Sequence, residues 1–568
     1  MIVTVGIWIY ITVCFLVLGS GITELIKRIS GYECKDISLV WTLGLCMTTV
    51  YAEYFSLFSG VGKLANGIMI AVLCLILYIN RKKALKWCKT VWTEIKVLDK
   101  KYIVIAIVFA ILFIAISSQK AHHADTDLYH AQAIRWIEDY GVVKGLGNLH
   151  NRLAYNSAFM CLQALFSGAF LIGQSTHVVN GYICFCAFGY AMITLLHAKR
   201  ICPSNMFCGA IICYILYAVK IISSPNTDIL ALLLVLFILQ KWCQQIEKHS
   251  QDIGVYCILS VIGAFTVSVK LSAAMIVLLA VKPVFILGKK KKWREILLLG
   301  SAIIIAVAPF IIRNILISGY LLYPYSTIDL FDVDWKMSKS VVDFDRREIM
   351  IYAKGISDYF QSGMKIREWF PIWWEQQGIP VHVFIGINIL LGIWECCNTL
   401  KLIHKRVVNW DRVFVFGTLC IMLVFWLFSA PNSRYGIVFL FCIPCLVLGD
   451  ILKKVSYKGM WSGAGVLAVV LIGVFGSCIR ERMDEISIKR PGYYIYRECK
   501  ETDWDDNIMY VALENCYCGY YFLPATPYEK ILGFIEMRGD DIQEGFRPRS
   551  DVKEIYYNNS GMIYTPVK

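Results

Sequence analysis

Long apolar runs recur along this 568-residue chain, and they constrain its fold more than any other feature. A run of about 18–20 apolar residues is long enough to cross the ~30 Å hydrocarbon core of a bilayer as a helix. Backbone polar groups in lipid must be paired within the segment, so such runs form helices. Hydrophobic residues make up 58% of the chain and charged residues 17%, against about 45–50% and 25% in soluble proteins. The sequence therefore predicts an all-α polytopic membrane protein.

Basic residues set the predicted orientation of these helices. They concentrate in segment 81–101 and in the run 289–294, and short basic loops are typically cytoplasmic. Basic runs between apolar segments indicate membrane topology, so we expect no nucleic-acid binding. With these loops inside, the pattern predicts about 14 spans with both termini outside. All-helical spans favour an inner or plasma membrane over an outer membrane.

The predicted topology divides the chain into a transmembrane domain, 1–478, and an extracytoplasmic C-terminal region, 479–568. Loops 119–153 and 318–378 lie outside. The apolar stretch 154–173 begins and ends on the outer side, and its aromatic residues recur at helical spacing, so we expect an interfacial amphipathic helix. The spans are predicted near residues 2–22, 37–58, 64–80, 101–118, 177–197, 207–222, 226–243, 254–270, 272–288, 296–317, 379–397, 411–430, 434–449 and 460–478.

The C-terminal region has a different composition from the spans. Acidic residues outnumber basic ones there, and short mixed strands and turns predict a small α/β unit. Cys499, Cys516 and Cys518 would lie in an oxidising compartment, where a disulfide can form, but the spacing does not select a pair.

The first outer loop holds the strongest candidates for chemistry. Asp125 and Asp127 follow a predicted span directly, and four of the nine histidines lie in the same loop. A carboxylate at the membrane surface can act as a general base or a metal ligand. A solvated acidic loop is the alternative, and the histidines favour a structural or hydrogen-bonding role.

Three cations form a second candidate set. Lys270, Arg313 and Arg434 lie at the outer ends of predicted spans, away from the side that basic residues favour. A charge near hydrocarbon is costly, so such residues face a polar cavity or an anion, or else extend to the interface. Their shared exception to the charge rule favours an anion site, such as a lipid phosphate.

Tryptophans mark the end of the second outer loop. Trp369, Trp373 and Trp374 suit a membrane interface, and they could also stack on a sugar ring.

These pieces resemble the GT-C glycosyltransferases, which include lipid A aminoarabinose transferases and protein O-mannosyltransferases. The resemblance rests on an outer loop with Ala124-Asp125-Thr126-Asp127, then the stretch 154–173, then a span that ends in basic residues. A bacterial group of GT-C-like membrane proteins is more similar still, through short stretches spread over the chain. These stretches include Asp125–His130, Gly145–Arg152, Asn156-Ser157, Arg313-Asn314, Tyr323-Pro324 and Pro431–Arg434.

The resemblance implies a GT-C-like helical bundle and a polyprenyl-phosphate sugar as donor, used in the outer leaflet with an envelope glycan or lipid as acceptor. Asp125 would be the catalytic carboxylate, with Asp127 second. No cofactor is certain, but a divalent metal, Mg²⁺ or Mn²⁺, could bind these two. The residues expected to bind substrate are His130, His150, Arg152, Asn156, Lys270, Arg313, Tyr325 and Arg434.

Two further functions stay open at this point. An envelope polysaccharide polymerase or a transporter would also have many spans, although a transporter often shows repeated halves, which this sequence lacks. A non-catalytic envelope assembly protein could keep the same fold, because function depends on the site and not on the architecture.

Overall fold

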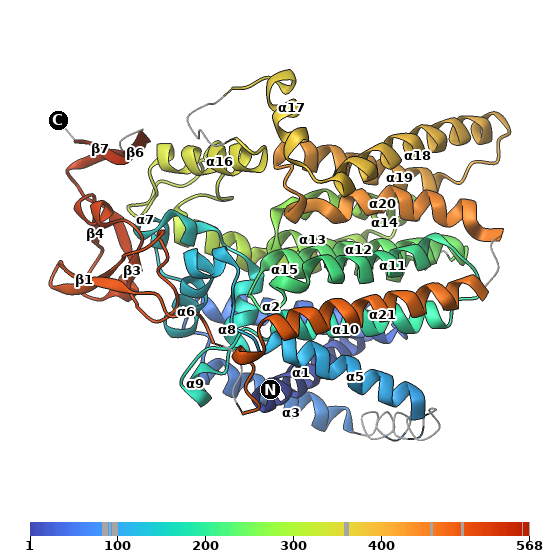
Figure 1. The fold of residues 1–568 in the computed structure, drawn as a ribbon, viewed down its shortest axis with the longest axis horizontal. Helices are drawn as coiled ribbons and strands as arrows, with labels where there is room; N and C mark the ends of the chain where they lie inside the picture. The colour runs from blue at the N-terminus through green and yellow to red at the C-terminus, as the bar shows by residue number, and fades with distance from the viewer. Residues whose placement is uncertain are drawn as a thin grey trace.

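The computed structural model describes residues 1–81, 89, 93, 100–250, 252–356, 363–454, 458–489, 493–558 and 561–566. Most of the basic segment 81–101 lies outside these residues. The described helices run side by side in one bundle (Figure 1), and each predicted span overlaps a helix or two helices in direct succession. The protein is therefore mostly helical, as the sequence predicted.

The first part of the bundle contains the helices that precede residue 248. Its helices are α1 (Ile2–Ser30), α2 (Ile37–Ser56), α3 (Lys63–Ile79), α5 (Lys100–Ser117), α6 (Ala131–Asp139), α7 (Leu146–Leu149), α8 (Ala158–Leu165), α9 (Ala169–Ile172), α10 (Val179–Leu196), α11 (Pro203–Ala218) and α12 (Thr227–Glu247).

The second part begins with a helix that packs against α12. Its helices are α13 (Ile253–Val269), a 3₁₀ segment η4 (Leu271–Ala280), α14 (Val281–Lys289), α15 (Trp293–Ser318), α16 (Lys339–Ala353), α17 (Ile366–Gln376), α18 (Ile379–His404), α19 (Trp410–Ser429), α20 (Ser433–Ile451) and α21 (Lys458–Glu481).

Nine helices of the described residues are long and apolar enough to cross a membrane. Two further apolar helices are shorter than these nine. α3 and α13 have 17 residues each, which is roughly 25 Å of helix. The helical, apolar character of the predicted fold is confirmed, and the total of about 14 spans stays a prediction.

α12 lies at the centre of the bundle. Almost all of its residues are buried, from Thr227 at its start to Gln245 near its end. A helix that is hydrophobic on all sides is typically buried in a protein core or spans a membrane. α11, α13 and α20 pack against it, and its first turn is therefore held rigidly.

The structure does not form the single amphipathic helix predicted over 154–173, and the position of this stretch at a membrane interface stays a prediction. The chain forms α8 and α9 instead, separated by Gly168 in a left-handed conformation (φ 70°). Every residue of α8 is buried, against α2 and α6 among others, whereas α9 is exposed. The helical spacing of the aromatic residues is that of a buried helix and not of an amphipathic one. Residues of the first loop cover the face that was expected to meet water.

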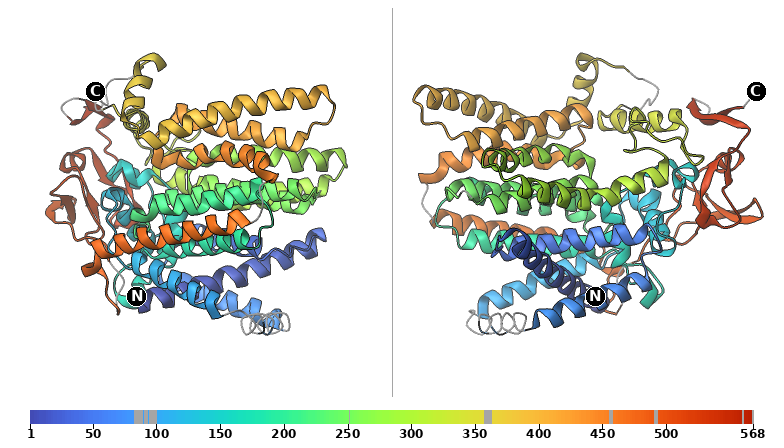
Figure 2. Two further views of the ribbon diagram at one scale, coloured as in Figure 1. Left: turned by 45° about the vertical axis from the view of Figure 1, so that its right-hand side comes forward. Right: turned by 180° about the vertical axis from the view of Figure 1, so that it is seen from behind.

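Both long loops and the C-terminal region gather at one end of the bundle, which we call the loop end (Figures 1 and 2). The amino group of Met1 donates to Ser487 O at 2.9 Å, so the N-terminus and the segment after α21 share this end. The turns between α14 and α15 and between α18 and α19 lie at the opposite end, which we call the basic end.

The C-terminal region contains β-strands and short 3₁₀ turns. β1 (Cys499–Trp504) pairs antiparallel with β2 (Asn507–Ala512), which pairs parallel with β3 (Ala525–Thr526). β4 (Ile535–Met537) pairs with β5 (Phe546–Pro548), and β6 (Val552–Asn558) with β7 (Gly561–Pro566). Residues 479–481 of this region are the end of α21, but no α-helix occurs in residues 493–558 and 561–566, so the predicted α/β character is wrong there. Cys499, Cys516 and Cys518 are free thiols.

A second hydrophobic core joins this region to the first loop. Trp136 and Leu149 of the loop and Trp504 and Phe546 of the strands are buried in the same cluster. The C-terminal region therefore packs on the first loop and fixes its shape.

Candidate functional site

Asp125 lies where the chain leaves α5 and enters the first loop. It directly precedes a π-helical turn, η1 (Thr126–His130), which continues into α6. Turns of this kind are rare and are frequent at functional sites. The sequence-predicted carboxylate is therefore held by irregular backbone at the loop end.

Arg434 connects Asp125 to the helices of the bundle. Asn432 caps α20 by accepting the backbone N–H of Arg434 at 3.0 Å, which places Arg434 in the first turn. Its Nη2 donates to Asp125 Oδ2 at 2.6 Å, and its Nε lies 3.3 Å from Asp228 Oδ2. The rigid fork of guanidinium donors allows one arginine to bridge two carboxylates.

Asp228 is the buried anchor of this arrangement. It lies in the first turn of α12, where Asn226 accepts its backbone N–H at 2.7 Å. The partial positive charge of a helix N-terminus favours a carboxylate there. Lys270, the residue between α13 and η4, pairs with the other oxygen, Oδ1.

Asp125, Asp228, Lys270 and Arg434 together form what we call the four-charge cluster. Two carboxylates balance two cations, and both cations also face the ring of Tyr435, at 4.7 Å for Lys270 and 4.9 Å for Arg434. Cation–π contacts strengthen when water is excluded. The structure thus brings together Asp125, Lys270 and Arg434, three of the residues that the sequence singled out.

The cluster determines the charge state of Asp125. Burial is the largest single influence and by itself would raise the pKa of its carboxyl, but the charge and hydrogen bond of Arg434, together with the neighbouring His130 and His123, hold the pKa well below its usual range. Asp125 is therefore an ionised carboxylate at neutral pH. Burial lowers the pKa of neighbouring His130 to about 3, and it also lowers the pKa of His123, so both imidazoles are neutral.

His123 lies between Asp125 and Arg434. Its Nδ1 lies 3.2 Å from the backbone N–H of Asp125, and its Nε2 lies 3.0 Å from Arg434 Nη1. A neutral imidazole has one accepting nitrogen, so one of these contacts is a hydrogen bond at a time. His123 can therefore change partner without leaving its place.

Asp127 faces away from the cluster toward the C-terminal region. The guanidinium of Arg497 donates to its Oδ2 at 2.9 and 2.5 Å, and Gly519 N donates to its backbone carbonyl at 3.0 Å. Asp125 and Asp127 thus have different partners and do not form a shared ligand pair. Among the described residues, no group of three or more His, Cys, Asp or Glu side chains is arranged to hold a metal. These residues do not fit the metal site that the resemblance allowed.

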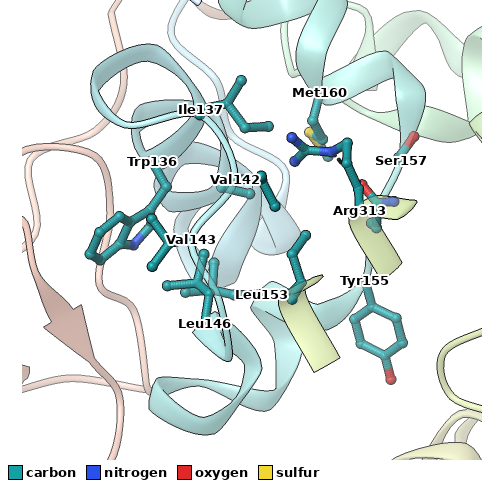
Figure 3. Close-up of a pocket in the computed structure, with 14 residues that line it drawn as sticks. Trp136, Ile137, Val142, Val143, Leu146, Leu153, Tyr155, Ser157, Met160 and Arg313 are labelled. Atoms are coloured by element: carbon teal, nitrogen blue, oxygen red, sulfur yellow. Dashed lines mark hydrogen bonds between the residues drawn. The ribbon is translucent and has the colours of Figure 1, made fainter. Parts of the chain in front are cut away.

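Arg313 belongs to a different group of side chains (Figure 3). It donates to Ser56 Oγ at 2.6 Å and to Asn156 Oδ1 at 3.1 Å, and it lines a cavity of about 20 Å³ with Asn156. Such a cavity has room for about one water molecule. In Figure 3 the guanidinium lies near Met160, with Val142 and Leu153 on the loop side. Arg313 and Asn156 therefore hold the start of α8 to α2 and α15.

Residues of the first loop also join it to its neighbours. Arg152 Nη2 donates to Glu348 Oε1 on α16 at 2.7 Å. His150 is buried against Tyr528 of the C-terminal region, and burial lowers its pKa to about 3. Tyr325 is half-buried in a turn of the second loop, where its backbone N–H donates to Leu322 O. The geometry gives Arg152 and His150 roles in packing the loops.

The tryptophans of α17 support the segment that leads to Arg434. Trp369 and Trp373 are buried, so the predicted interface position is wrong for these two. Trp373 Nε1 donates to Pro431 O at 2.6 Å, three residues before Arg434, and Trp374 stacks on His382. Gly436 allows Trp426 to pack on α20, because a Cβ there would lie 2.2 Å from the Trp426 ring.

Sequence reasoning missed Asp228, His123 and Tyr435. Asp228 was the easiest of these to predict, because a carboxylate inside an apolar run is energetically costly and therefore suggests a functional site. His123 lay in the histidine cluster of the loop, but the sequence did not indicate which histidine would approach a cation.

A family model described as a domain of unknown function, DUF8201, matches residues 1–441. The chain belongs to this family. All four members of the four-charge cluster lie within the part that the DUF8201 model matches, whereas the C-terminal region lies beyond it. Searches of curated proteins and of solved structures gave no match.

Proposed function

We propose that this protein is a glycosyltransferase of the bacterial plasma membrane that acts at the loop end, on the outer side. The donor would be a polyprenyl-phosphate-linked sugar, and the acceptor would be an envelope glycan or lipid. The observation that carries the proposal is the four-charge cluster, in which the ionised loop carboxylate Asp125 pairs with Arg434, and Asp228 joins Arg434 to Lys270 at the ends of apolar helices. A transferase of this kind needs a carboxylate beside the acceptor and cations beside the leaving phosphate.

The reaction would proceed in one displacement. The acceptor hydroxyl oxygen forms a bond to the anomeric carbon, and the bond from that carbon to the phosphate oxygen breaks. The electron pair leaves with the polyprenyl phosphate, and the hydroxyl proton passes to the carboxylate of Asp125. Arg434 and Lys270 would stabilise the negative charge that grows on the leaving phosphate. This interaction lowers the barrier because it is stronger in the transition state than in the ground state.

The gathering of both loops, the N-terminus and the C-terminal region at one end supports a single working face. The neutral His123 and His130 would border the carboxylate without adding positive charge. Arg313 would contribute through the placement of α8, since its donors are directed to Ser56 and Asn156.

The decisive experiment compares surface glycans, by mass spectrometry, from cells with the wild-type gene, without it, and with Asp125→Asn. We expect the deletion and Asp125→Asn to lose the same single sugar while the variant stays in the membrane at normal abundance. Full glycan modification by Asp125→Asn would refute the proposal. Shortened chains would instead indicate a polymerase, and unchanged glycans in the deletion a non-catalytic role.

A further inference from the structure

We propose that Asp125 occupies the binding position of an anionic phosphate group, and that this group displaces Asp125 from Arg434 when it binds. The inference rests on the proposed function and adds a ligand-exchange step to it. The four-charge cluster already has two negative and two positive charges. The exchange explains how it can still bind an anion.

The two carboxylates of the cluster differ in how firmly they are held. Asp228 is 1% exposed and lies in the first turn of the central helix, and it contacts both Lys270 and Arg434. Asp125 is 20% exposed and lies before the π-helical turn, and its carboxylate pairs with Arg434 alone of the two cations. Asp125 is therefore the partner that can leave.

Both cations are partly exposed. Arg434 is 26% exposed and Lys270 is 21% exposed. Both lie beside the ring of Tyr435, so they share a small region. Asp228 neutralises one of the two positive charges, which leaves one charge and the outward donors of Arg434 for a ligand. A phosphate group suits this uncompensated positive charge because it presents several oxygens to the guanidinium donors of Arg434.

The exchange would also change the chemistry of Asp125. While Arg434 is bonded to it, this carboxylate is a weak base, because the cation stabilises its ionised form. A phosphate that takes over Arg434 removes that stabilisation and frees the oxygen for an acceptor hydroxyl. His123 can follow, since its contacts with Asp125 and Arg434 alternate. Binding of the donor would thus activate the base only when the leaving group is in place.

Binding measurements on the purified full-length protein in detergent test the exchange. The probes are dodecyl phosphate and, separately, inorganic phosphate, which distinguish a lipid headgroup from a free anion. Removal of the competing charge in Asp125→Asn should tighten binding of the preferred probe by about tenfold or more, since a charged hydrogen bond no longer has to be broken. Arg434→Gln should lose binding.

Asp334→Asn is the matched control. It also removes one negative charge at the loop end, but its partners are Arg538 and Arg547 of the C-terminal region, and we expect unchanged affinity. Equal or weaker binding by Asp125→Asn, or no binding to either probe by wild type and Asp125→Asn alike, would overturn the exchange.

The two proposals fail in different ways. If Asp125→Asn binds phosphate more tightly but modifies glycans normally, the exchange holds and the transferase function is wrong. If this variant loses glycan modification and also loses phosphate affinity, the function holds and Asp125 is a co-ligand of the anion, which refutes the exchange.

Discussion

α20 carries a charged cluster at each end, and the two clusters are built differently. At the basic end, Arg412 donates to both carboxylate oxygens of Glu395 on α18, at 2.7 and 2.9 Å, and also pairs with Asp450 near the end of α20. At the loop end, Arg434 pairs with Asp125 and Asp228. The two ends are roughly 24 Å apart along the helix.

The difference lies in where the carboxylates come from. Glu395 and Asp450 both lie on long helices, and Glu395, which accepts two hydrogen bonds from Arg412, is 1% exposed. The loop-end cluster takes Asp125 from irregular backbone that is packed under the C-terminal region. A cluster whose carboxylates all lie on helices fixes the bundle, whereas we propose that a cluster with one carboxylate on irregular backbone can exchange that carboxylate for a ligand.

Replacing Arg434 with lysine should have the largest effect. A single ammonium cannot serve Asp125, Asp228 and His123 together, so either the charged hydrogen bond to Asp125, worth about 1.5–3 kcal/mol, or the ion pair with Asp228 is lost. We expect sugar transfer to fall by about 100-fold or more, measured as modified glycan per folded protein. Lys270→Arg, which keeps a cation beside Asp228, should reduce sugar transfer by less. A wild-type rate of sugar transfer in Arg434→Lys would contradict the functional role that distinguishes the loop-end cluster from the basic-end cluster.

Glu395→Gln should break the basic-end cluster and reduce stability without reducing activity. Arg412 keeps Asp450 as a partner, so we expect a loss of about 2–3 kcal/mol in the free energy of unfolding. Denaturation in detergent measures it. Lys453→Gln, at a side chain that is 47% exposed, should change the free energy of unfolding by less than about 0.5 kcal/mol. A drop in activity per folded molecule in Glu395→Gln would contradict the structural role.

Glu138 makes the attachment of the C-terminal region depend on pH. Its carboxylate accepts Tyr520 OH at 2.6 Å and Ser175 Oγ at 2.7 Å, and burial raises its pKa to about 7. Because the folded pKa exceeds the unfolded value of 4.5, stability is greatest below pH 4.5 and is lost as pH rises through 7. We expect a decrease of about 2 kcal/mol between pH 5 and pH 7.

Glu138→Gln should remove this part of the pH dependence. Melting temperatures in detergent across this range would show it as a flatter profile, with Asp139→Asn, on the same helix, as the control. An unchanged slope in Glu138→Gln would mean that another group causes the pH dependence.

Asp127→Asn should have the smallest effect on transfer. Its partner is Arg497 of the C-terminal region, and it does not belong to the four-charge cluster. We expect less than about a threefold reduction in glycan modification, because the loss concerns loop packing. A loss as large as that of Asp125→Asn would move the catalytic carboxylate to Asp127.

Much of the candidate site was predictable because an unpaired charge at the end of an apolar helix is energetically costly. Asp125, Lys270 and Arg434 stood out as charges at the ends of apolar runs, and they meet in the structure. Arg313 stood out for the same reason but contacts Ser56 and Asn156 instead. A sequence shows that a charge needs a partner, but it does not show which of several partners lies within reach.

The sequence by itself determined the helical bundle, its apolar segments and the polarity that separates a basic end from a loop end, because these depend on local composition and helix length. Only the tertiary structure decided that 154–173 breaks at Gly168 and buries α8, and that Asp125 and Asp127 face opposite partners. Those outcomes depend on contacts between segments hundreds of residues apart, such as Asp125 with Arg434 and Asp127 with Arg497. No local pattern encodes such a pairing, since its free energy exists only once the helices and the C-terminal region have packed.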